Sequence, residues 1–153
     1  MEKIESFKID HLNLYSGLYV SRLDFYNSQA VTTFDLRFVA PYKETPLEIP
    51  AMHTLEHLGA TFFRNSNISD KVVYFGPMGC RTGFYLVLFN KWESIDIFPL
   101  VLEFLDFVIS FDGEVPGATK IECGNYLEQD LITAKIYAKA YKNSLVKNKR
   151  LKY

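Results

Sequence analysis

The stretch His53-Thr54-Leu55-Glu56-His57 is the one around which the rest of the chain is organised. Pro50 comes just before it, and proline suits the first turn of a helix, where its missing N–H has no partner to lose. We therefore predict a helix from Pro50 to about Asn65. On a helix, positions i, i+3 and i+4 share a face, which brings both imidazoles and the Glu56 carboxylate together. The apolar stripe expected to hold this helix in a core is Met52, Leu55, Gly59 and Phe62.

This pattern is typical of a metal site. Two imidazoles one helical turn apart can bind a single divalent ion, and a carboxylate beside them can move protons at whatever the ion binds. The plainer alternative is a pair of ordinary helix histidines next to a surface glutamate. The chain has only three histidines. Because two of them stand at ligand spacing around a glutamate, we favour the metal.

Length and composition indicate one soluble domain spanning residues 1–153. Apolar residues make up 48% of the chain and charged residues 23%, and the formal net charge is −1. This balance predicts no nucleic-acid partner and no binding to an anionic membrane. Thirteen Phe and ten Tyr indicate a thick core or an apolar subunit interface.

The sequence shows neither a signal peptide nor a membrane-spanning segment. Residues 1–5 are charged and lack the apolar run of a signal peptide. The longest nearly apolar stretch, residues 97–111, contains Glu103 and Asp106 and is too short to cross a bilayer. We therefore expect a cytoplasmic protein, in which Cys80 and Cys123 are thiols or metal ligands rather than a disulfide.

The remaining pattern predicts an α+β fold, with an antiparallel sheet packed against helices on one side. One or two short strands are expected within residues 4–20, and further strands at 31–39, 71–75 and 83–88. A second helix, N-capped by Asp96 with Pro99 in its first turn, should run to residue 111, and a third from about 127 to 146. Arg37 alternates with the apolar residues of its strand, so it is interpreted as a solvated side chain or, less favoured, an anion clamp.

Two further residues complete a chemical scheme. Cys123, expected just ahead of a helix N-terminus that would favour its thiolate, is the candidate third ligand beside His53 and His57. Three protein ligands leave a position open, which suits a Lewis-acid metal better than a structural one. Cys80 is flanked by Gly79 and Arg81, and with Glu56 it would form an acid/base pair able to shuttle protons around a carbonyl.

Five collinear blocks of the chain resemble one family. They are Ser6-Phe7-Lys8-Ile9-Asp10-His11, Phe34-Asp35-Leu36-Arg37, His53-Thr54-Leu55-Glu56-His57-Leu58, Pro77-Met78-Gly79-Cys80-Arg81-Thr82-Gly83-Phe84-Tyr85 and Glu122-Cys123-Gly124-Asn125-Tyr126. In this order and over nearly the whole chain, they resemble the S-ribosylhomocysteine lyases, the LuxS family.

The resemblance implies a fold, an assembly, a metal ion and a role for individual residues of these blocks. It implies an α+β homodimer with two active sites at the subunit interface, and a metal ion, Fe(II) with Zn or Co as substitutes, held by His53, His57 and Cys123. Glu56 and Cys80 would be the general acid/base residues. Ser6, His11 and Arg37 would line the substrate pocket. The family cleaves S-ribosylhomocysteine to homocysteine and 4,5-dihydroxypentane-2,3-dione, the precursor of autoinducer-2.

The chain departs from the commoner family pattern in two places. Tyr74 stands where an Asp usually precedes the catalytic Cys by six residues, which would remove one polar contact to the substrate sugar. Residues 17–22, Gly-Leu-Tyr-Val-Ser-Arg, stand where Ala-Pro-Tyr-Val-Arg is usual. Because the metal ligands and both proton carriers are retained, activity is expected, with affinity or substrate preference open to change.

Two other functions fit part of the pattern. His-x-x-Glu-His is also a metallopeptidase signature, in which Glu122 or Glu128 would supply a carboxylate ligand. A peptidase would leave Cys80 without a role, and 153 residues leave little room for a polypeptide cleft. A non-catalytic domain with a structural metal and a dimerising aromatic face is the third hypothesis, and it predicts that replacing Cys80 changes nothing except stability.

Overall fold

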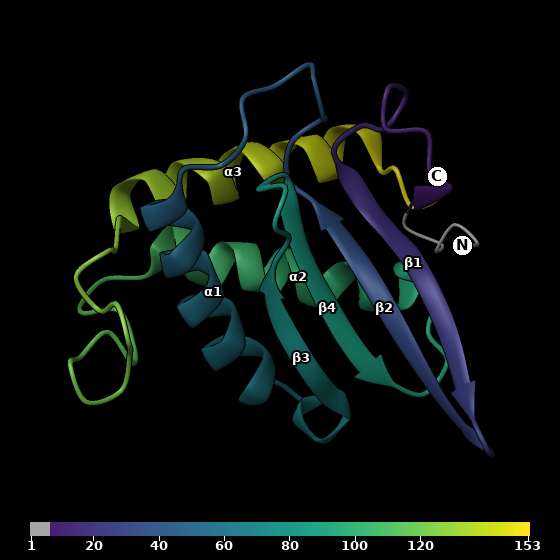
Figure 1. Ribbon diagram of the computed structural model, residues 1–153, viewed down its shortest axis with the longest axis horizontal. Coiled ribbons are helices and arrows are strands. Elements are labelled where there is room, and N and C mark those ends of the chain that lie inside the picture. The colour runs from purple at the N-terminus through teal and green to yellow at the C-terminus, as the bar shows by residue number, and fades with distance from the viewer. Residues whose placement is uncertain (1–6) are drawn as a thin grey trace.

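A computed structural model describes residues 7–153 of the protein (Figure 1). In this described part of the chain, four antiparallel strands form one sheet in the order β1-β2-β4-β3. The strands are β1 (Gly17–Tyr26), β2 (Gln29–Arg37), β3 (Val72–Pro77) and β4 (Gly83–Phe89). β1 and β2 form a hairpin whose two-residue turn places Asn27 at φ 53°, a left-handed conformation that Asn tolerates well.

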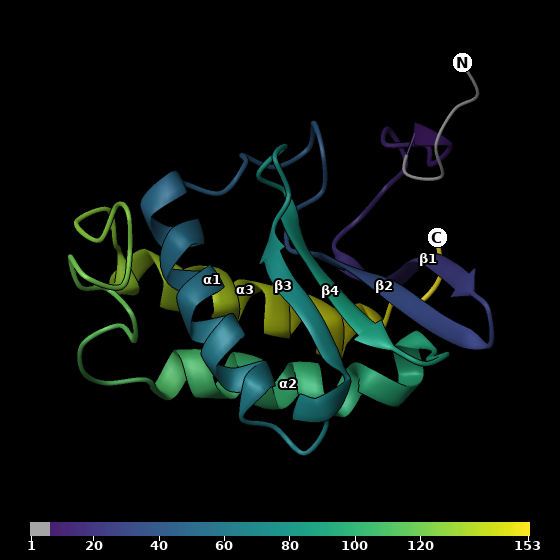
Figure 2. The same ribbon diagram turned by 60° about the horizontal axis from the view of Figure 1, so that its bottom comes forward.

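Three helices, α1 (Ile49–Arg64), α2 (Ser94–Ser110) and α3 (Leu131–Asn148), lie on one side of this sheet (Figures 1 and 2). Alternate residues of β2 and β4 point toward the helices and are fully buried, among them Phe34, Leu36, Phe84 and Leu86. They join the buried side chains of all three helices in one hydrophobic cluster. The predicted α+β class, with helices on one side of an antiparallel sheet, is confirmed.

α1 forms as its sequence predicts, with Pro50 in the first turn and Arg64 as its last residue. Leu55 and Gly59 of the predicted stripe are buried, and Met52 and Phe62 are partly buried against the core. Gly59 allows the helix to approach β3 closely, since a Cβ at that position would lie 2.1 Å from the Phe75 ring. The helix carrying the His-x-x-Glu-His stretch is therefore held firmly against the sheet edge.

α2 starts earlier than predicted. Its N-cap is Glu93, and Asp96 stands at the third helical position, where its carboxylate accepts a hydrogen bond from the Glu93 N–H at 2.8 Å. The two residues form a capping box, an arrangement in which each side chain accepts the other residue's backbone N–H. The prediction that Asp96 is the N-cap is thus wrong, and Pro99 lies in the second turn of the helix.

α3 starts later than predicted, at Leu131 instead of residue 127. Asp130 is the N-cap, and its carboxylate accepts hydrogen bonds from the Thr133 N–H at 2.9 Å and the Thr133 hydroxyl at 2.7 Å. Residues 111–130 between α2 and α3 form a succession of turns without helix or strand. They lie at the end of the molecule near the start of α1 (Figure 1).

The strand prediction within residues 4–20 is largely wrong where it can be compared. Residues 8–13 form turns, in which the Asp10 carboxylate accepts from the Leu12 N–H at 3.0 Å and from the Asn13 amide at 2.7 Å. The strand itself begins at Gly17 and continues to Tyr26. Asp and Asn side chains compete with the backbone for hydrogen bonds, and here this local chemistry overrides the aromatic and β-branched pattern.

The strands predicted at 31–39, 71–75 and 83–88 correspond to β2, β3 and β4 within a few residues at each end. A single turn of 3-10 helix, Ser69–Lys71, leads into β3. Within residues 7–153, none of the helices has the combination of length and apolar character that crossing a bilayer requires.

Candidate metal centre and active site

His53 and His57 project from α1 toward residues 111–130, and each uses one ring nitrogen to anchor that segment. His53 Nδ1 lies 2.9 Å from the Glu128 carbonyl oxygen, and His57 Nδ1 lies 2.8 Å from the Pro116 carbonyl oxygen. A carbonyl oxygen only accepts hydrogen bonds, so each Nδ1 carries the hydrogen. The Gln129 amide nitrogen also approaches His53 Nδ1, but at 3.2 Å it is the longer contact.

The other ring nitrogens then face each other without hydrogens. His53 Nε2 and His57 Nε2 are 3.0 Å apart, and the Cys123 sulfur lies 3.5 Å from His53 Nε2. Two lone pairs at that distance repel unless a cation stands between them. These three side chains, called the metal triad below, have all their ligand atoms within 4.8 Å of one another.

The spacing of the metal triad suits a tetrahedral ion. With bonds of about 2.05 Å to nitrogen and 2.3 Å to sulfur, two nitrogens are separated by about 3.3 Å and a nitrogen and a sulfur by about 3.6 Å. The separations of 3.0 and 3.5 Å are close to these values. Hydrogen bonds from the outer nitrogen to a carbonyl are also typical of histidines that bind metals, because they orient the ring.

Thr54, next to His53, ties the same segment to the helix. It is fully buried; its hydroxyl donates to Gln129 Oε1 at 2.7 Å and accepts from the Asp130 N–H at 2.9 Å. On the other side of the triad, Gly117 has φ +73°, and a Cβ there would lie 3.2 Å from His57 Nδ1. Glycine therefore meets two needs at this position, a left-handed backbone and close contact with the ring.

Cys123 reaches the triad by a route that differs from the predicted one. α3 begins at Leu131, so Cys123 does not precede a helix N-terminus, and that part of the prediction is wrong. Its position is fixed by turns, in which the Cys123 N–H donates to the Thr119 carbonyl at 2.9 Å. The Asn125 N–H in turn points to the Cys123 sulfur at 3.4 Å. These contacts orient Cys123 within its turn, and its sulfur lies beside His53 Nε2.

The carboxylates considered as peptidase-type ligands are used elsewhere. Glu122 accepts a hydrogen bond from the Thr119 hydroxyl at 2.6 Å, and Glu128 accepts one from the Asn125 amide at 2.5 Å. Neither belongs to the group of side chains that could hold an ion. Glu56 lies on the same helix as the triad histidines and is partly exposed, and its carboxylate has no hydrogen bond to any residue in 7–153. Within residues 7–153, its carboxylate is therefore not held by a partner.

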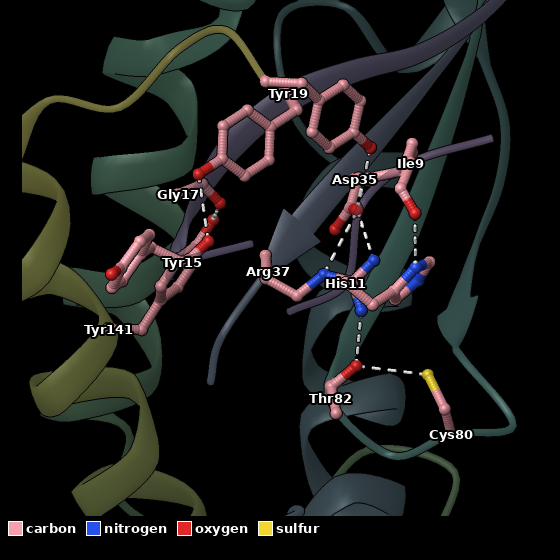
Figure 3. A network of polar contacts seen from close by, with 11 residues as sticks. Ile9, His11, Tyr15, Gly17, Tyr19, Asp35, Arg37, Cys80, Thr82 and Tyr141 are labelled. Atoms are coloured by element: carbon pink, nitrogen blue, oxygen red, sulfur yellow. Dashed lines mark hydrogen bonds and ion pairs between the residues drawn. The ribbon is translucent and has the colours of Figure 1, made fainter. Parts of the chain in front are cut away.

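A second group of polar residues surrounds Arg37 at the end of β2 (Figure 3). The Cys80 sulfur lies 3.1 Å from the Thr82 hydroxyl, which also bonds Arg37 Nη1. Arg37 Nε and Nη2 donate to Asp35 Oδ2 at 3.2 and 2.5 Å. The Tyr153 hydroxyl donates to the same carboxylate oxygen at 2.9 Å. These five residues are called the Arg37 cluster below.

The expectation that Arg37 is solvated is wrong. Its side chain is 3% exposed and forms an ion pair with Asp35, which is 1% exposed. Burial raises the pKa of the Asp35 carboxyl, and the positive charge of Arg37, and to a smaller extent that of His11, acts in the opposite direction. The alternation of β2 correctly turned Arg37 away from the helices, but a cover on that second face could not be read from the strand itself.

The remaining residues predicted for the site have fewer contacts, and one of them lies outside the described part of the chain. Cys80 is exposed in the turn between β3 and β4, and both cysteines are free, as predicted. His11 is partly exposed, and its Nδ1 bonds the Ile9 carbonyl at 2.9 Å. Ser6 lies outside the described residues. Tyr74 is 50% exposed on β3, and its hydroxyl occupies the space above Gly76.

Residues 7–153 thus contain two separate groups of candidate functional side chains. Among residues 7–153, no hydrogen bond or ion pair joins the metal triad to the Arg37 cluster. Sequence reasoning missed Thr54, Asp35, Thr82 and Tyr153. Only Asp35 carried a signal, since it stands two positions before Arg37 on one strand and so shares its face.

Comparison with known proteins confirms the resemblance. The family described as S-Ribosylhomocysteinase (LuxS) matches residues 4–152. An S-ribosylhomocysteine lyase of Finegoldia magna is 48% identical over 155 residues, which cover 100% of this chain and 99% of the relative. Those of Clostridium beijerinckii and Borreliella burgdorferi strain B31 are 49% and 47% identical, over 97% and 100% of this chain and 94% and 99% of theirs. The chain therefore belongs to the LuxS family of S-ribosylhomocysteinases.

Proposed function

We propose that this protein is a metal-dependent lyase that cleaves the thioether of S-ribosylhomocysteine to homocysteine and 4,5-dihydroxypentane-2,3-dione. The observation that carries the proposal is the metal triad, in a chain of this family: two bare imidazole nitrogens 3.0 Å apart with a cysteine sulfur beside them. Three protein ligands leave a position open for substrate.

The donor set fits a divalent transition metal, and we propose Fe(II), with Zn or Co as substitutes. Imidazole nitrogen and thiolate sulfur are ligands that iron and zinc both accept. When bound, the ion would act as a Lewis acid toward a carbonyl or hydroxyl oxygen of the sugar.

The reaction requires protons to be moved in sequence. The carbon–sulfur bond breaks readily only when a carbonyl lies next to the carbon that adjoins the sulfur-bearing one, because that intervening carbon can then lose a proton. In the open-chain sugar the aldehyde is too far along. Two proton shifts move the carbonyl into place, and β-elimination then releases homocysteine. We propose that the Cys80 sulfur takes and returns the carbon-bound protons, and that the Glu56 carboxylate serves the oxygens and the leaving sulfur.

Substrate binding is assigned to Ser6, His11 and Arg37. The Arg37 guanidinium is rigidly held and charged, which suits an anionic or hydroxyl-bearing part of the substrate. The proposal is supported by the Thr82 hydroxyl, which contacts both Arg37 Nη1 and the Cys80 sulfur. Tyr74, in place of the usual Asp, lies within β3 and offers a phenol hydroxyl that is positioned over Gly76.

We further propose a cytoplasmic homodimer with active sites at the subunit interface. One face of the sheet has no helix over it (Figure 2). On this face Phe89 is 43% exposed and Tyr74 is 50% exposed. A second copy of the chain packed on this face would bury these aromatic side chains. Dimerisation would also let the Arg37 cluster of one protomer and the metal triad of its partner act on one substrate, although they are not joined within a chain.

The experiment that tests the function measures thiol release. Reduced protein loaded with Fe(II) or Co(II) is incubated with S-ribosylhomocysteine, and homocysteine is measured with a thiol reagent and by mass spectrometry. We expect one homocysteine for each dione formed. Absence of both products from fully metallated, reduced dimer would overturn the proposal, and release of homocysteine together with intact ribose in place of the dione would indicate hydrolysis instead of elimination.

A further inference from the structure

We propose that Asp35 and Tyr153 are positioning residues that hold the Arg37 guanidinium in the orientation needed to bind substrate. This inference rests on the proposed function, in which Arg37 contacts substrate. It assigns a role to two residues outside the catalytic and binding sets given above, and it brings the segment that follows α3 into the site.

The first support is the way in which the guanidinium is restrained. Three of its five N–H groups are engaged, Nε and one on Nη2 by Asp35, and one on Nη1 by Thr82. The remaining two, one on each terminal nitrogen, make no hydrogen bond to residues 7–153. Arginine is well suited to such use, because one edge of its planar fork can be fixed while another is presented to a ligand.

The second support is that Asp35 is held from behind. All three donors, two from Arg37 and one from Tyr153, go to Oδ2, while the buried Oδ1 has no partner among the described residues. A carboxylate with one unsatisfied oxygen would turn toward any new donor. The Tyr153 hydroxyl bond opposes that rotation, because it adds a third donor that holds Oδ2 in place.

The third support is that Tyr153 is itself fixed. Its ring stacks on Tyr19, with centroids 4.5 Å apart and planes at 17°. Tyr19 lies opposite Asp35 in the β1–β2 register, so the stacking of the two rings keeps Tyr153 beside Asp35. Lys149 ends α3 in a left-handed conformation, and the Leu18 N–H donates to the Arg150 carbonyl at 2.9 Å, so the segment returns along β1.

The test uses Tyr153→Phe, which removes only the hydroxyl that reaches Asp35, with Tyr19→Phe as the matched control. The control removes the other hydroxyl of the same stacked pair without touching Asp35. We expect Tyr153→Phe to raise KM for S-ribosylhomocysteine about three- to tenfold with little change in kcat, in line with the net contribution of one ordinary hydrogen bond. Asp35→Asn should raise KM further, and Tyr19→Phe should leave it unchanged.

A double-mutant cycle separates positioning from general stabilisation. In an Arg37→Ala background, Tyr153→Phe should have no further effect on KM, because the group it positions is gone. An equal effect in both backgrounds would overturn the proposal, as would an unchanged KM in both Tyr153→Phe and Asp35→Asn while Arg37→Ala raises it.

A readout without substrate keeps this inference separate from the proposed function. In ¹⁵N-labelled protein, the Arg37 Nε–H resonance reports how fast that hydrogen exchanges with water. We expect faster exchange in Tyr153→Phe and Asp35→Asn and wild-type exchange in Tyr19→Phe. Unchanged exchange in both variants would overturn the positioning role even if the enzyme is active, whereas failure of thiol release by wild type would overturn the lyase proposal alone.

Discussion

The metal triad and the Arg37 cluster differ in how their charges and lone pairs are balanced. In the triad, the two Nε2 atoms face each other at 3.0 Å with no hydrogen between them, so the arrangement is electrostatically incomplete without a cation. In the Arg37 cluster, the guanidinium and the Asp35 carboxylate neutralise each other in a buried pair. The difference shows which group needs an added ion and which is complete as folded, and the following substitutions probe it.

The largest effect is expected for Cys80→Ala, which removes the thiol at the edge of the Arg37 cluster. Proton transfer by a positioned side chain contributes about 10²- to 10⁴-fold, so kcat should fall by roughly that factor. Metal content should stay at the wild-type level, because Cys80 is not in the triad. Turnover by the thiol assay and metal analysis on the same preparation check both halves. A loss of metal would show that the two groups are not independent.

Cys123→Ala attacks the triad instead. Removing one of three ligands should weaken metal affinity by at least about 100-fold, since even loss of a residue that merely orients a ligand costs 10- to 100-fold. Competition with a chromophoric chelator measures the affinity, with Cys80→Ala as the cysteine-to-alanine control. Wild-type affinity in Cys123→Ala would remove this residue from the ion's coordination.

Thr54→Val tests whether the triad depends on the segment behind it. The change keeps the shape of the side chain and removes the hydroxyl that bonds Gln129 and Asp130. We expect metal affinity to fall about tenfold, through looser orientation of His53. Thr61→Val is the matched control, because the Thr61 hydroxyl donates only to the His57 carbonyl of its own helix, at 2.8 Å. Equal losses in both variants would point to a general effect on α1.

Asp130→Ala should have the smallest effect, a loss of about 1 kcal/mol in the free energy of unfolding of the metal-free protein, as is typical for removal of an N-cap. Hydrogen bonds from Thr133 lower the pKa of Asp130 below 3.8. Its stabilising contribution is therefore complete above that pH and is lost as the pH falls through the lower, folded-state pKa.

Asp130→Asn provides the conservative comparison, because Asn caps helices about as well but does not titrate. Urea unfolding at several pH values should show wild type losing stability relative to Asp130→Asn only in the acid range. Parallel curves for the two proteins from neutral to acid pH would contradict the assigned role of the Asp130 charge.

The sequence predicted those parts of the molecule that depend on local periodicity. The spacing of His53, Glu56 and His57 on a helix started by Pro50 follows from helical geometry alone, and β2 and β4 follow from alternation. The ends of α2 and α3 were misjudged because several acidic residues near each end could serve as cap, and hydrogen bonds formed in the folded chain decide between them. The folded protein uses Glu93 as the N-cap of α2, where Asp96 was predicted. It uses Asp130 as the N-cap of α3, which was predicted to start near residue 127.

The site was predictable in its ligands but not in its support. Cys123 could be predicted as a ligand because few other soft ligands exist in the chain. The turns that bring it to the triad have no periodic sequence pattern and could not be predicted. The buried Arg37–Asp35 pair is completed by the Tyr153 hydroxyl, and Tyr153 is 118 positions away from Asp35 in the sequence. Contacts of that separation require the topology of the sheet and the return of the chain after α3.

The imidazoles of α1 hold residues 111–130 with one nitrogen and offer the other to a cation, while Cys123 lies within that same irregular segment. Loading of the ion therefore closes a cross-link between a rigid helix and the stretch of chain with the least regular structure. Protease resistance of this stretch should consequently increase with metal occupancy. In a cell short of the metal, the metal-free enzyme would then be the form most readily degraded.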